Sequence, residues 1–537
     1  MATEEETKLE LFLQWLQVNG VELRGCKIKY CDTNKGFGLF STTNASDGVL
    51  LVVPLDLAIT PMRVLEDPLL GPPCRAMLEE GEVDDRFLMI LFLTMEHLRS
   101  KSSWKPYLDM IPRSFGSPLW HTDEEFEELK GTTKKSLQAV FEEKVKDLVN
   151  RLLVLDGDSD WANSVFWTRA LNIPFPRTYI FPEGSESSGI NSTNNGEKLN
   201  SMEAETLWVE GLVPGIDFCN HSLRPAATWE VDSTGSATEV AFSMYLLSVN
   251  QGPPETEQEI TISYGNKGNE ELLYLYGFVI EENPDDYLMV HYPAEALQSL
   301  PFSDSKTQLL QAQKAELRCL LPKSMLDHGF FSCLSSESKN LNGGAQDNVS
   351  SYSWSGQRKT PSYANKLVFP EDFLTTLRTI AMQENEIFNV QSLLEELVGS
   401  EGQREPSDAE VRAAVWEACG NAKALQLLVD LLNTKFIDLE DGSGTEESDT
   451  KLLEKSYVKD NPALSTSVDK ADSSSEEVIS KNRWTSIVYR RGQKQLTRLY
   501  LREAEHALQL CLKEESSNLE EFQFPMPCDW IRFDEKD

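Results

Sequence analysis

The sequence has little of what several classes of protein require. Its nine cysteines are scattered, Cys26 and Cys31 form the only close pair, and no Cys-x-Cys or Cys-x-x-Cys occurs. A zinc cage or a redox dithiol is therefore not expected, and we predict no metal site. No run reaches about 18 uninterrupted apolar residues, so we expect no membrane-spanning helix. Residues 1–6 are acidic and lack both a signal core and a transit-peptide composition, which predicts a cytoplasmic or nuclear protein.

Basic residues are also scarce. The 537 residues include 50 Lys and Arg against 87 Asp and Glu, which gives a formal net charge of −37. Such a surface repels polyphosphate, so we expect no direct nucleic-acid partner. It attracts cationic partners such as a lysine-bearing protein at low salt, although acidity can also serve solubility alone. Composition leaves the oligomeric state open.

Hydrophobic periodicity changes along the chain between strand-like and helix-like patterns. Alternating or continuous apolar runs at residues 27–30, 39–42 and 49–54 predict strands, whereas residues 7–19 and 84–99 have helical spacing. We therefore predict an α+β protein with a β-rich domain that a helical insert splits, followed by an all-helical domain. The expected ranges are 1–60 and 206–290 for the β-rich domain, 61–205 for the insert and 291–537 for the helical domain.

The C-terminal region carries three further predictions. Two segments rich in Ser, Asn, Gly and Asp, residues 332–362 and 438–482, are expected to be disordered. Ser407 and Glu410 have the spacing of a capping box at the start of a helix. On the last helix a cationic stripe, defined as Arg490, Lys494, Arg498 and Arg502, is spaced by four residues. The stripe predicts either a solvated face that pairs with nearby Glu or a surface that grips a folded partner.

Two polar segments stand out in the second β-rich part. Taken alone, an Asn-His pair between turn residues indicates a satisfied structural cluster, and Tyr-Gly after a strand indicates a turn. Their order and spacing, about forty residues apart, are more informative than either alone. The segments are Asp217-Phe218-Cys219-Asn220-His221-Ser222 and Ile260-Thr261-Ile262-Ser263-Tyr264-Gly265.

Together with two earlier segments, the sequence resembles the SET-domain methyltransferases of the Rubisco large-subunit methyltransferase-like family. A Gly-x-Gly alone is a weak signal, but four segments in the family's order are specific. They are Lys35-Gly36-Phe37-Gly38-Leu39, Thr168-Arg169, the segment from Asp217 to Ser222, and Tyr264-Gly265 through Tyr276-Gly277-Phe278. The resemblance implies an S-adenosylmethionine-dependent protein-lysine N-methyltransferase that acts on a non-histone protein. It also implies a helical C-terminal domain that binds the substrate.

The resemblance also assigns roles to particular residues. It places Tyr264 at the reacting methyl group as the catalytic tyrosine and Tyr276 beside the substrate amine. Residues at the cofactor would be Lys35, Gly36, Phe37, Arg169, Asn220 and His221, with Arg169 at the carboxylate end. Residues of the substrate pocket would be Asp217, Trp229 and Leu171, in addition to Tyr276. His221 would contact the cofactor rather than act as a general base.

These residue types suit the chemistry of lysine methylation. A free lysine has a pKa of about 10.4, so the site must favour the neutral amine by desolvation and hold it with oxygen atoms. Alignment of donor and acceptor can then supply most of the reduction in the barrier. An apolar channel with tyrosine hydroxyls meets these needs without a metal.

Two alternatives to this function stay open. One is a catalytically weak SET-fold protein that serves as a binding or scaffold module. The other is a protein-histidine N-methyltransferase, because the resemblance extends to relatives that methylate a histidine of actin. That branch has an asparagine two residues after the arginine, where this sequence has Leu171. An apolar side chain suits the lysine stem, so we favour lysine.

Overall fold

The structure, a computed structural model, describes residues 4–32, 35–42, 48–81, 83–132, 158–180, 206–249, 256–332, 361–398, 404–458 and 477–521. The chain forms two compact units, each assembled from separate segments. Unit 1 comprises residues 1–127, 135–279 and 453–486, and unit 2 comprises residues 128–134, 280–452 and 487–537. The predicted division placed the boundary at residue 290, whereas contacts place it at Val279. In the described residues no helix is long and apolar enough to cross a membrane.

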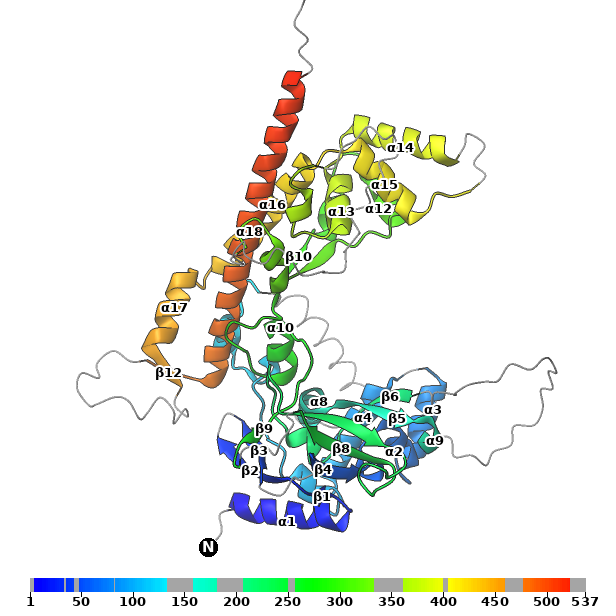
Figure 1. Cartoon of the computed structure of the whole chain (residues 1–537), viewed down its shortest axis with the longest axis vertical. Helices are drawn as coiled ribbons and strands as arrows, with labels where there is room; N and C mark the ends of the chain where they lie inside the picture. Colours follow the sequence, from blue (N-terminus) through cyan, green and yellow to red (C-terminus); the bar gives the residue numbers. More distant parts are fainter. Residues whose placement is uncertain are drawn as a thin grey trace, which may run out of the picture. The chain divides into compact units, whose positions relative to one another are not determined.

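Unit 1 contains most of the strands, which come from distant parts of the sequence, as the blue and green arrows of Figure 1 show. A four-stranded antiparallel sheet has the order β1-β4-β8-β7, and a three-stranded sheet has the order β2-β3-β9. The bounds are β1 (Glu22–Leu23), β2 (Cys26–Asp32), β3 (Gly36–Ser41), β4 (Val49–Pro54), β7 (Ala227–Asp232), β8 (Ser243–Ser248) and β9 (Glu259–Ile260). Two pairs complete the unit: β5 (Leu171–Pro176) with β6 (Thr206–Gly211), and β12 (Ser456–Val458) with β13 (Glu477–Ile479).

The helices of unit 1 lie at its N-terminus and in the predicted insert, which also contains β5. They are α1 (Glu4–Val18), η1 (Leu55–Leu57), α2 (Pro61–Glu66), α3 (Gly71–Glu79), α4 (Asp85–Leu98), α5 (Lys105–Leu108), η2 (Pro118–Trp120), α6 (Asp123–Glu127), α8 (Asp158–Arg169) and α9 (Arg177–Ile180). Short turns follow in η3 (Ile216–Phe218), α10 (Asn269–Glu271) and the π-helical η4 (Leu272–Tyr276). The Asp84 side chain caps α4 by accepting from the Phe87 N–H, as expected where an aspartate precedes an apolar helix.

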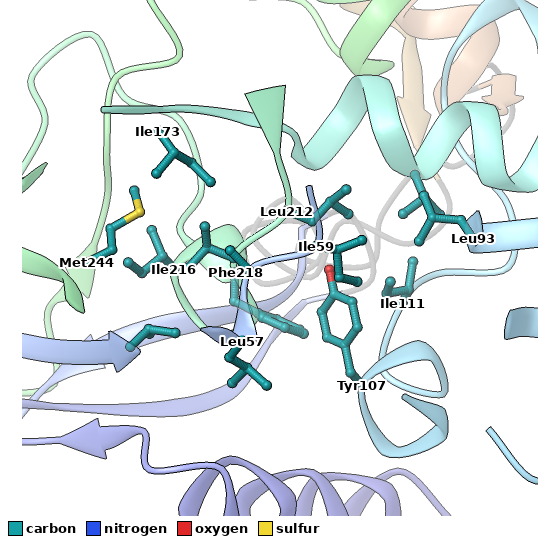
Figure 2. Close-up of a cluster of buried hydrophobic side chains, with 14 of the residues drawn as sticks. Leu57, Ile59, Leu93, Tyr107, Ile111, Ile173, Leu212, Ile216, Phe218 and Met244 are labelled. Atoms are coloured by element: carbon teal, nitrogen blue, oxygen red, sulfur yellow. The ribbon is translucent and has the colours of Figure 1, made fainter. Parts of the chain in front are cut away.

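One hydrophobic core joins these elements. It draws on α1, α4, α8, the strands and the turns that connect them. Figure 2 shows part of it, with Tyr107 and Phe218 among aliphatic side chains that include Leu57, Ile59, Ile111 and Leu212. Tyr107, Ile59 and Leu212 have no exposed surface, so the turn of η3 rests on a packed base. This rigid base positions the polar residues that follow Ile216.

Unit 2 is mainly helical, which confirms the expected helical C-terminal region, but it also holds a hairpin. Its strands β10 (Tyr287–His291) and β11 (Arg318–Pro322) pair antiparallel. Its helices are α11 (Ala294–Leu297), α12 (Ser303–Ala312), η5 (Lys323–His328), η6 (Ala364–Lys366), α13 (Glu371–Ala381), α14 (Glu384–Val398), α15 (Asp408–Ala418) and α16 (Ala422–Glu440). The helices α17 (Glu446–Lys455) and α18 (Lys481–Glu521) each cross a boundary between the units.

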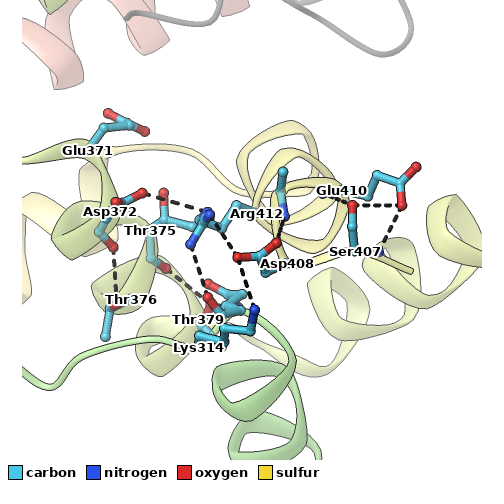
Figure 3. Close-up of polar contacts among 12 residues, drawn as sticks. Lys314, Glu371, Asp372, Thr375, Thr376, Thr379, Ser407, Asp408, Glu410 and Arg412 are labelled. Carbon is cyan, nitrogen blue, oxygen red and sulfur yellow. Dashed lines mark hydrogen bonds and ion pairs between the residues drawn. The ribbon is translucent and has the colours of Figure 1, made fainter. Parts of the chain in front are cut away.

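Polar contacts tie α15 to its neighbours in unit 2. Ser407 and Glu410 form the predicted capping box, which is confirmed by both of its hydrogen bonds. Arg412 lies between two carboxylates, Asp408 at 3.3 Å and Asp372 of α13 at 3.7 Å (Figure 3). Because these groups are partly exposed, each ion pair adds little stability and chiefly fixes the register of the helices.

The prediction of disorder at residues 438–482 is wrong for the part that the structure describes. Residues 438–458 and 477–482 contain the end of α16, all of α17, both strands of the β12–β13 pair and the start of α18. The single buried residue of α17 is Asp449, so a charged contact holds this helix instead of an apolar face. Hydrophobic patterning cannot detect such a helix. Residues 459–476, and residues 333–360 of the other predicted segment, lie outside the described residues.

The cationic stripe is not one continuous surface, because Arg490 and Lys494 are buried whereas Arg498 and Arg502 are exposed. Arg490 and Lys494 both bind the carboxylate of Asp449. Arg490 also pairs with Glu128, and Lys494 donates to the Gly444 carbonyl at 2.6 Å. Arg498 pairs with Glu446 at 3.0 Å, and the Arg502 guanidinium lies 4.1 Å from the centre of the Phe331 ring. We call Arg490, Lys494, Asp449 and Glu128 the α18 charge cluster.

Candidate active site

A cavity of about 520 Å³ opens in unit 1 where α8, the β5–β6 pair, β7 and η4 meet. Its size is in the range of small-molecule sites in proteins. Six predicted site residues line it: Arg169, Leu171, Asp217, Trp229, Tyr264 and Tyr276. Its remaining wall is supplied mainly by α8, which includes Trp167, and by polar residues near solvent, among them Arg86, Asn172, Glu210, Lys267 and Glu271.

Tyr264 is held by three contacts. Its hydroxyl donates to the Cys219 carbonyl oxygen at 2.8 Å, and its backbone N–H donates to Nδ1 of His221 at 3.1 Å. Its ring stacks on Tyr276, with the ring centres 5.1 Å apart. Because hydroxyl, backbone and ring are each restrained, the Tyr264 oxygen has a defined position at the cavity wall.

Both tyrosines are neutral phenols at ordinary pH. Burial raises the pKa of Tyr264, and the Arg169 cation only partly opposes this effect. Burial also raises the pKa of Tyr276 to about 12, with a contribution from the carboxylate of Glu271. Neither phenol is therefore available as a base near neutrality, and their oxygens can instead accept hydrogen bonds from an amine.

Arg169 and Asp217 form a buried pair at the base of the cavity. The Nη1 atom of Arg169 lies 3.0 Å from the Asp217 carbonyl oxygen and 3.4 Å from Oδ2. Tyr107 donates to the same Oδ2 at 2.6 Å, and the Gly215 N–H donates to Oδ1 at 3.1 Å. Burial nevertheless raises the pKa of Asp217, although Arg169 opposes the shift. Both carboxylate oxygens are occupied, so this side chain orients Arg169.

The cavity rim carries two ion pairs. Arg86 grips the Glu210 carboxylate through two hydrogen bonds of 2.9 and 3.1 Å, and its guanidinium lies over the Trp167 ring. Lys267 lies 3.6 Å from Glu271. Each rim carboxylate therefore has a cation beside it, which limits the net charge at the rim.

A second group of predicted residues gathers on Glu259, the first residue of β9. The Lys35 ammonium group lies 2.6 Å from Oε2 of Glu259, and Asn220 Nδ2 donates to Oε1 at 2.7 Å. Gly38 lies against this group, since a Cβ there would stand 2.7 Å from the sulfur of Cys31 and 3.1 Å from Asn220 Nδ2. Only glycine allows this close approach.

His221 connects the second group to Tyr264. Its Nδ1 atom accepts the Tyr264 N–H, so in the neutral ring the proton is on Nε2. Its ring also lies against Tyr264 and Phe278, with centres 5.1 and 6.0 Å away. The lone pair of Nδ1 is already engaged, which argues against this atom as a general base.

The structure thus brings most of the predicted residues into two neighbouring groups instead of one, while Gly36 and Phe37 follow Lys35 at the start of β3, where the Phe37 ring packs against Tyr30. Lys35, Gly36, Phe37, Asn220 and His221 do not line the cavity, but Asn220 and His221 directly follow Cys219, which does. The individual roles of the predicted residues stay predictions.

Sequence reasoning missed Glu259, which joins Lys35 to Asn220, and Tyr107, which holds Asp217. Glu259 immediately precedes the alternating run Ile260-Thr261-Ile262, and this position could have marked it. Tyr107 lies 110 residues from Asp217 and gives no local signal.

Comparison with curated proteins finds lysine methyltransferases. The chain is 28% identical over 309 residues to the chloroplastic [fructose-bisphosphate aldolase]-lysine N-methyltransferase of Arabidopsis thaliana, covering 56% of this chain and 58% of that protein. It is 27% identical to the Rubisco large subunit N-methyltransferase of Pisum sativum, covering 57% and 58%. An actin-histidine N-methyltransferase of Drosophila melanogaster is 24% identical, covering 53% and 51%. The chain thus spans little more than half the length of these relatives. No family model matches the chain.

Comparison with solved structures covers nearly the whole chain. A crystal structure of the SET domain of LSMT bound to lysine and AdoHcy matches with a TM-score of 0.61 at 18% identity, covering 97% of this chain and all of that chain. A structure of Rubisco LSMT bound to AdoMet matches with a TM-score of 0.58. The predicted resemblance and the predicted α+β SET fold are confirmed.

Proposed function

We propose that the protein is an S-adenosylmethionine-dependent protein-lysine N-methyltransferase that acts on a non-histone protein. The observation that carries the proposal is the stacked pair of neutral phenols, Tyr264 and Tyr276, in the wall of a cavity that also holds Arg169. Similarity to lysine methyltransferases and to SET-domain structures supports the same reaction.

The residues present fit the cofactor. Gly38 lets the backbone of β3 lie against Asn220 with no side chain between them, and Arg169 offers a guanidinium group that suits a carboxylate. Aromatic rings such as those of Tyr264 and Tyr276 also attract a cation, including a sulfonium. S-adenosylmethionine supplies the methyl group when it is bound. Backbone groups of Lys35, Gly36 and Phe37, together with Asn220 and His221, would hold the rest of it.

The chain's own residues would position the lysine amine and keep it neutral. The apolar wall around Leu171 would desolvate the lysine stem, which disfavours the ammonium form. The phenol oxygens of Tyr264 and Tyr276 would accept the amine hydrogens and direct its lone pair toward the methyl group. No base within the protein is required for this orientation, because the amine can lose its proton to water before it enters.

Histidine as the methyl acceptor is the second candidate function. Leu171 gives an imidazole ring nothing to bond, but the neighbouring Asn172 also lines the cavity and carries an amide. Asn172 is exposed, so it lies toward the rim, while Tyr264 and Tyr276 are half-buried. This arrangement favours an amine that reaches past the rim on a long stem.

A labelling experiment tests the proposal and separates it from the alternatives. The purified full-length protein would be incubated with isotopically marked S-adenosylmethionine and a cell extract, and labelled residues would be identified by mass spectrometry. We expect methyllysine, and label lower by about tenfold or more with Tyr264→Phe at equal protein concentration. Methylhistidine would overturn the choice of lysine. Binding of S-adenosylhomocysteine without any labelling would favour a scaffold, and absence of both would overturn the proposal.

The expected cytoplasmic or nuclear location stays a prediction. Imaging of the full-length protein with a fluorescent tag would check it, and accumulation in an organelle would contradict it.

A further inference from the structure

The β5–β6 pair presents one exposed tryptophan. Trp208 of β6 keeps 68% of its surface exposed, whereas the other tryptophans in the part of the chain that the structure describes are buried or half-buried. Its inward-facing neighbours belong to the core of unit 1, with Ile173 and Phe175 fully buried. The exposure is therefore a property of one face of a well-packed hairpin.

That face is continuous with the cavity rim. Antiparallel partners point to the same side of a sheet, and the register pairs Asn172 with Glu210 and Pro174 with Trp208. Side chains two residues apart on a strand also share a face. Asn172 and Glu210 line the cavity, so Trp208 and Pro174 extend its rim outward on the same surface. Trp229 adjoins this surface, since its Nε1 donates to the Asn172 carbonyl oxygen.

We propose that Trp208 and Pro174 form a docking surface for the substrate segment beside the target lysine, and that this surface selects an apolar side chain. The inference rests on the proposed function and adds a determinant of substrate choice. A lysine that reaches Tyr264 and Tyr276 must pass the rim, so the residues next to it must cross the surface around that rim. A large exposed indole at such a place gains contact area when a partner covers it.

The chemistry of the face indicates which side chain it binds. The Glu210 carboxylate accepts hydrogen bonds from Nε and Nη2 of Arg86, so the Trp208 indole does not lie beside an unpaired charge. Pro174, directly opposite Trp208, adds a second apolar and rigid surface. An aliphatic or aromatic substrate residue therefore fits better than a cationic one.

Strand geometry sets the position of that residue. Trp208 lies two residues from Glu210, a separation of about 7 Å along a strand. An extended substrate advances by about 3.3 Å per residue, so about 7 Å corresponds to two residues, and the selected side chain should be about two or three positions from the lysine.

Labelled sites from the extract experiment supply the test. Sites methylated by the wild-type protein should be enriched in an apolar residue two or three positions from the lysine, and Trp208→Ala should lose that enrichment. On a synthetic peptide of the best site, Trp208→Ala should raise KM about tenfold and change kcat by less than about twofold. Trp208→Leu should restore part of the affinity. Leu69→Ala, which trims another exposed apolar residue of unit 1, is the matched control and should match wild type.

The outcomes separate this inference from the function on which it rests. Methyllysine labelling with no positional preference, a cationic preference, or an unchanged KM in Trp208→Ala would overturn the docking surface alone. A loss of S-adenosylhomocysteine binding in Trp208→Ala would also overturn it, because the change would then act on the cofactor site. Failure of the wild-type protein to label any lysine would overturn both.

Discussion

Arg169 in unit 1 and Arg490 in unit 2 both bind a buried aspartate, but their surroundings differ. Asp217 and Asp449 have side chains that are 0% and 1% exposed. Arg490 has its donors committed to Asp449 and Glu128, and Lys494 beside it is fully buried. Arg169 retains 13% exposure and borders a cavity that two tyrosines share. A buried ion pair therefore indicates a binding site only when its cation keeps a face toward open space.

The largest effect is expected from Asp449→Asn. Arg490 and Lys494 would lose the carboxylate that they share, and breaking a buried pair costs about 3–5 kcal/mol. Urea unfolding followed by circular dichroism would measure the loss. Arg498→Met is the matched control. The Arg498 guanidinium pairs with Glu446 but is largely exposed, so this pair contributes about 1 kcal/mol or less to stability. If both variants unfold like wild type, the α18 charge cluster does not stabilise unit 2.

Tyr264→Phe tests the cavity of the candidate active site, where Arg169 keeps an exposed face. The change keeps the ring against Tyr276 but removes the hydroxyl that donates to the Cys219 carbonyl. We expect methyl transfer to fall by about tenfold or more, equivalent to about 1.4 kcal/mol, with unchanged affinity for S-adenosylhomocysteine. Tyr245→Phe removes another tyrosine hydroxyl of unit 1, one bound to Glu230 outside the cavity, and should retain activity. A rate within twofold of wild type would exclude a catalytic role for the Tyr264 hydroxyl.

The pH dependence of the rate separates positioning from base catalysis. The neutral fraction of a lysine amine with a pKa of about 10.4 rises tenfold per pH unit between about pH 7 and pH 9. Burial holds the pKa of both tyrosines above their ordinary value, so neither phenol should ionise in that range. The logarithm of kcat/KM should therefore rise with a slope of about one in wild type and in Tyr264→Phe alike. A plateau present only in wild type would show that Tyr264 titrates.

Arg169→Lys sharpens the comparison of the two arginines. Lysine keeps the positive charge but lacks the planar guanidinium group, which can donate two hydrogen bonds to one carboxylate. We therefore expect the Kd for S-adenosylhomocysteine to rise about tenfold. Arg86→Lys is the control at the same cavity, because Arg86 is committed to Glu210, and its effect should be below about threefold. Calorimetric titration measures both. Equal effects would mean that exposure to the cavity does not distinguish the two cations.

The smallest effect on activity is expected from Gly116→Ala, because residue 116 affects the candidate active site only indirectly, through its packing against Gly277. A Cβ at Gly116 would stand 2.3 Å from the carbonyl oxygen of Gly277, the residue that ends η4 directly after Tyr276. The backbone must shift, and Tyr276 with it, so we expect kcat to fall about fivefold with little change in Kd for S-adenosylhomocysteine. Gly492→Ala, where a Cβ would meet only Asp286 Oδ2 at an ordinary contact distance of 3.7 Å, controls for substitution of glycine. A normal kcat for Gly116→Ala would show that Tyr276 tolerates displacement.

Sequence reasoning succeeded where the signal is local. The apolar run of α4 and the capping box at Ser407 arise from neighbouring residues, and both were predicted. The four segments of the family resemblance led to Arg169 and Tyr264, which the structure brings to one cavity. Local patterns report periodicity and capping, and these features survive folding in most contexts.

What sequence reasoning missed depends on contacts between distant residues. Asp449 holds α17 in place by binding charges more than forty residues away, so α17 was predicted to be disordered. Glu259 binds both Lys35, which is 224 residues away in the sequence, and Asn220, which is 39 residues away. No spacing in the sequence predicts these contacts. The cationic stripe followed helical periodicity correctly, but periodicity alone does not say whether a face meets solvent or carboxylates.

Each unit is assembled from separate segments of the sequence, and this has a consequence for folding during synthesis on the ribosome. Unit 1 takes residues 453–486 from near the end of the chain, while most of unit 2 lies earlier, at residues 280–452. The N-terminal SET-like part must therefore wait, incomplete, until a late segment emerges, and contacts of such long sequence separation form slowly. A chain that stops near residue 295 would lack β12 and β13 as well as unit 2. Nascent chains of this protein are thus expected to depend on chaperones for longer than those of a protein with two consecutive domains.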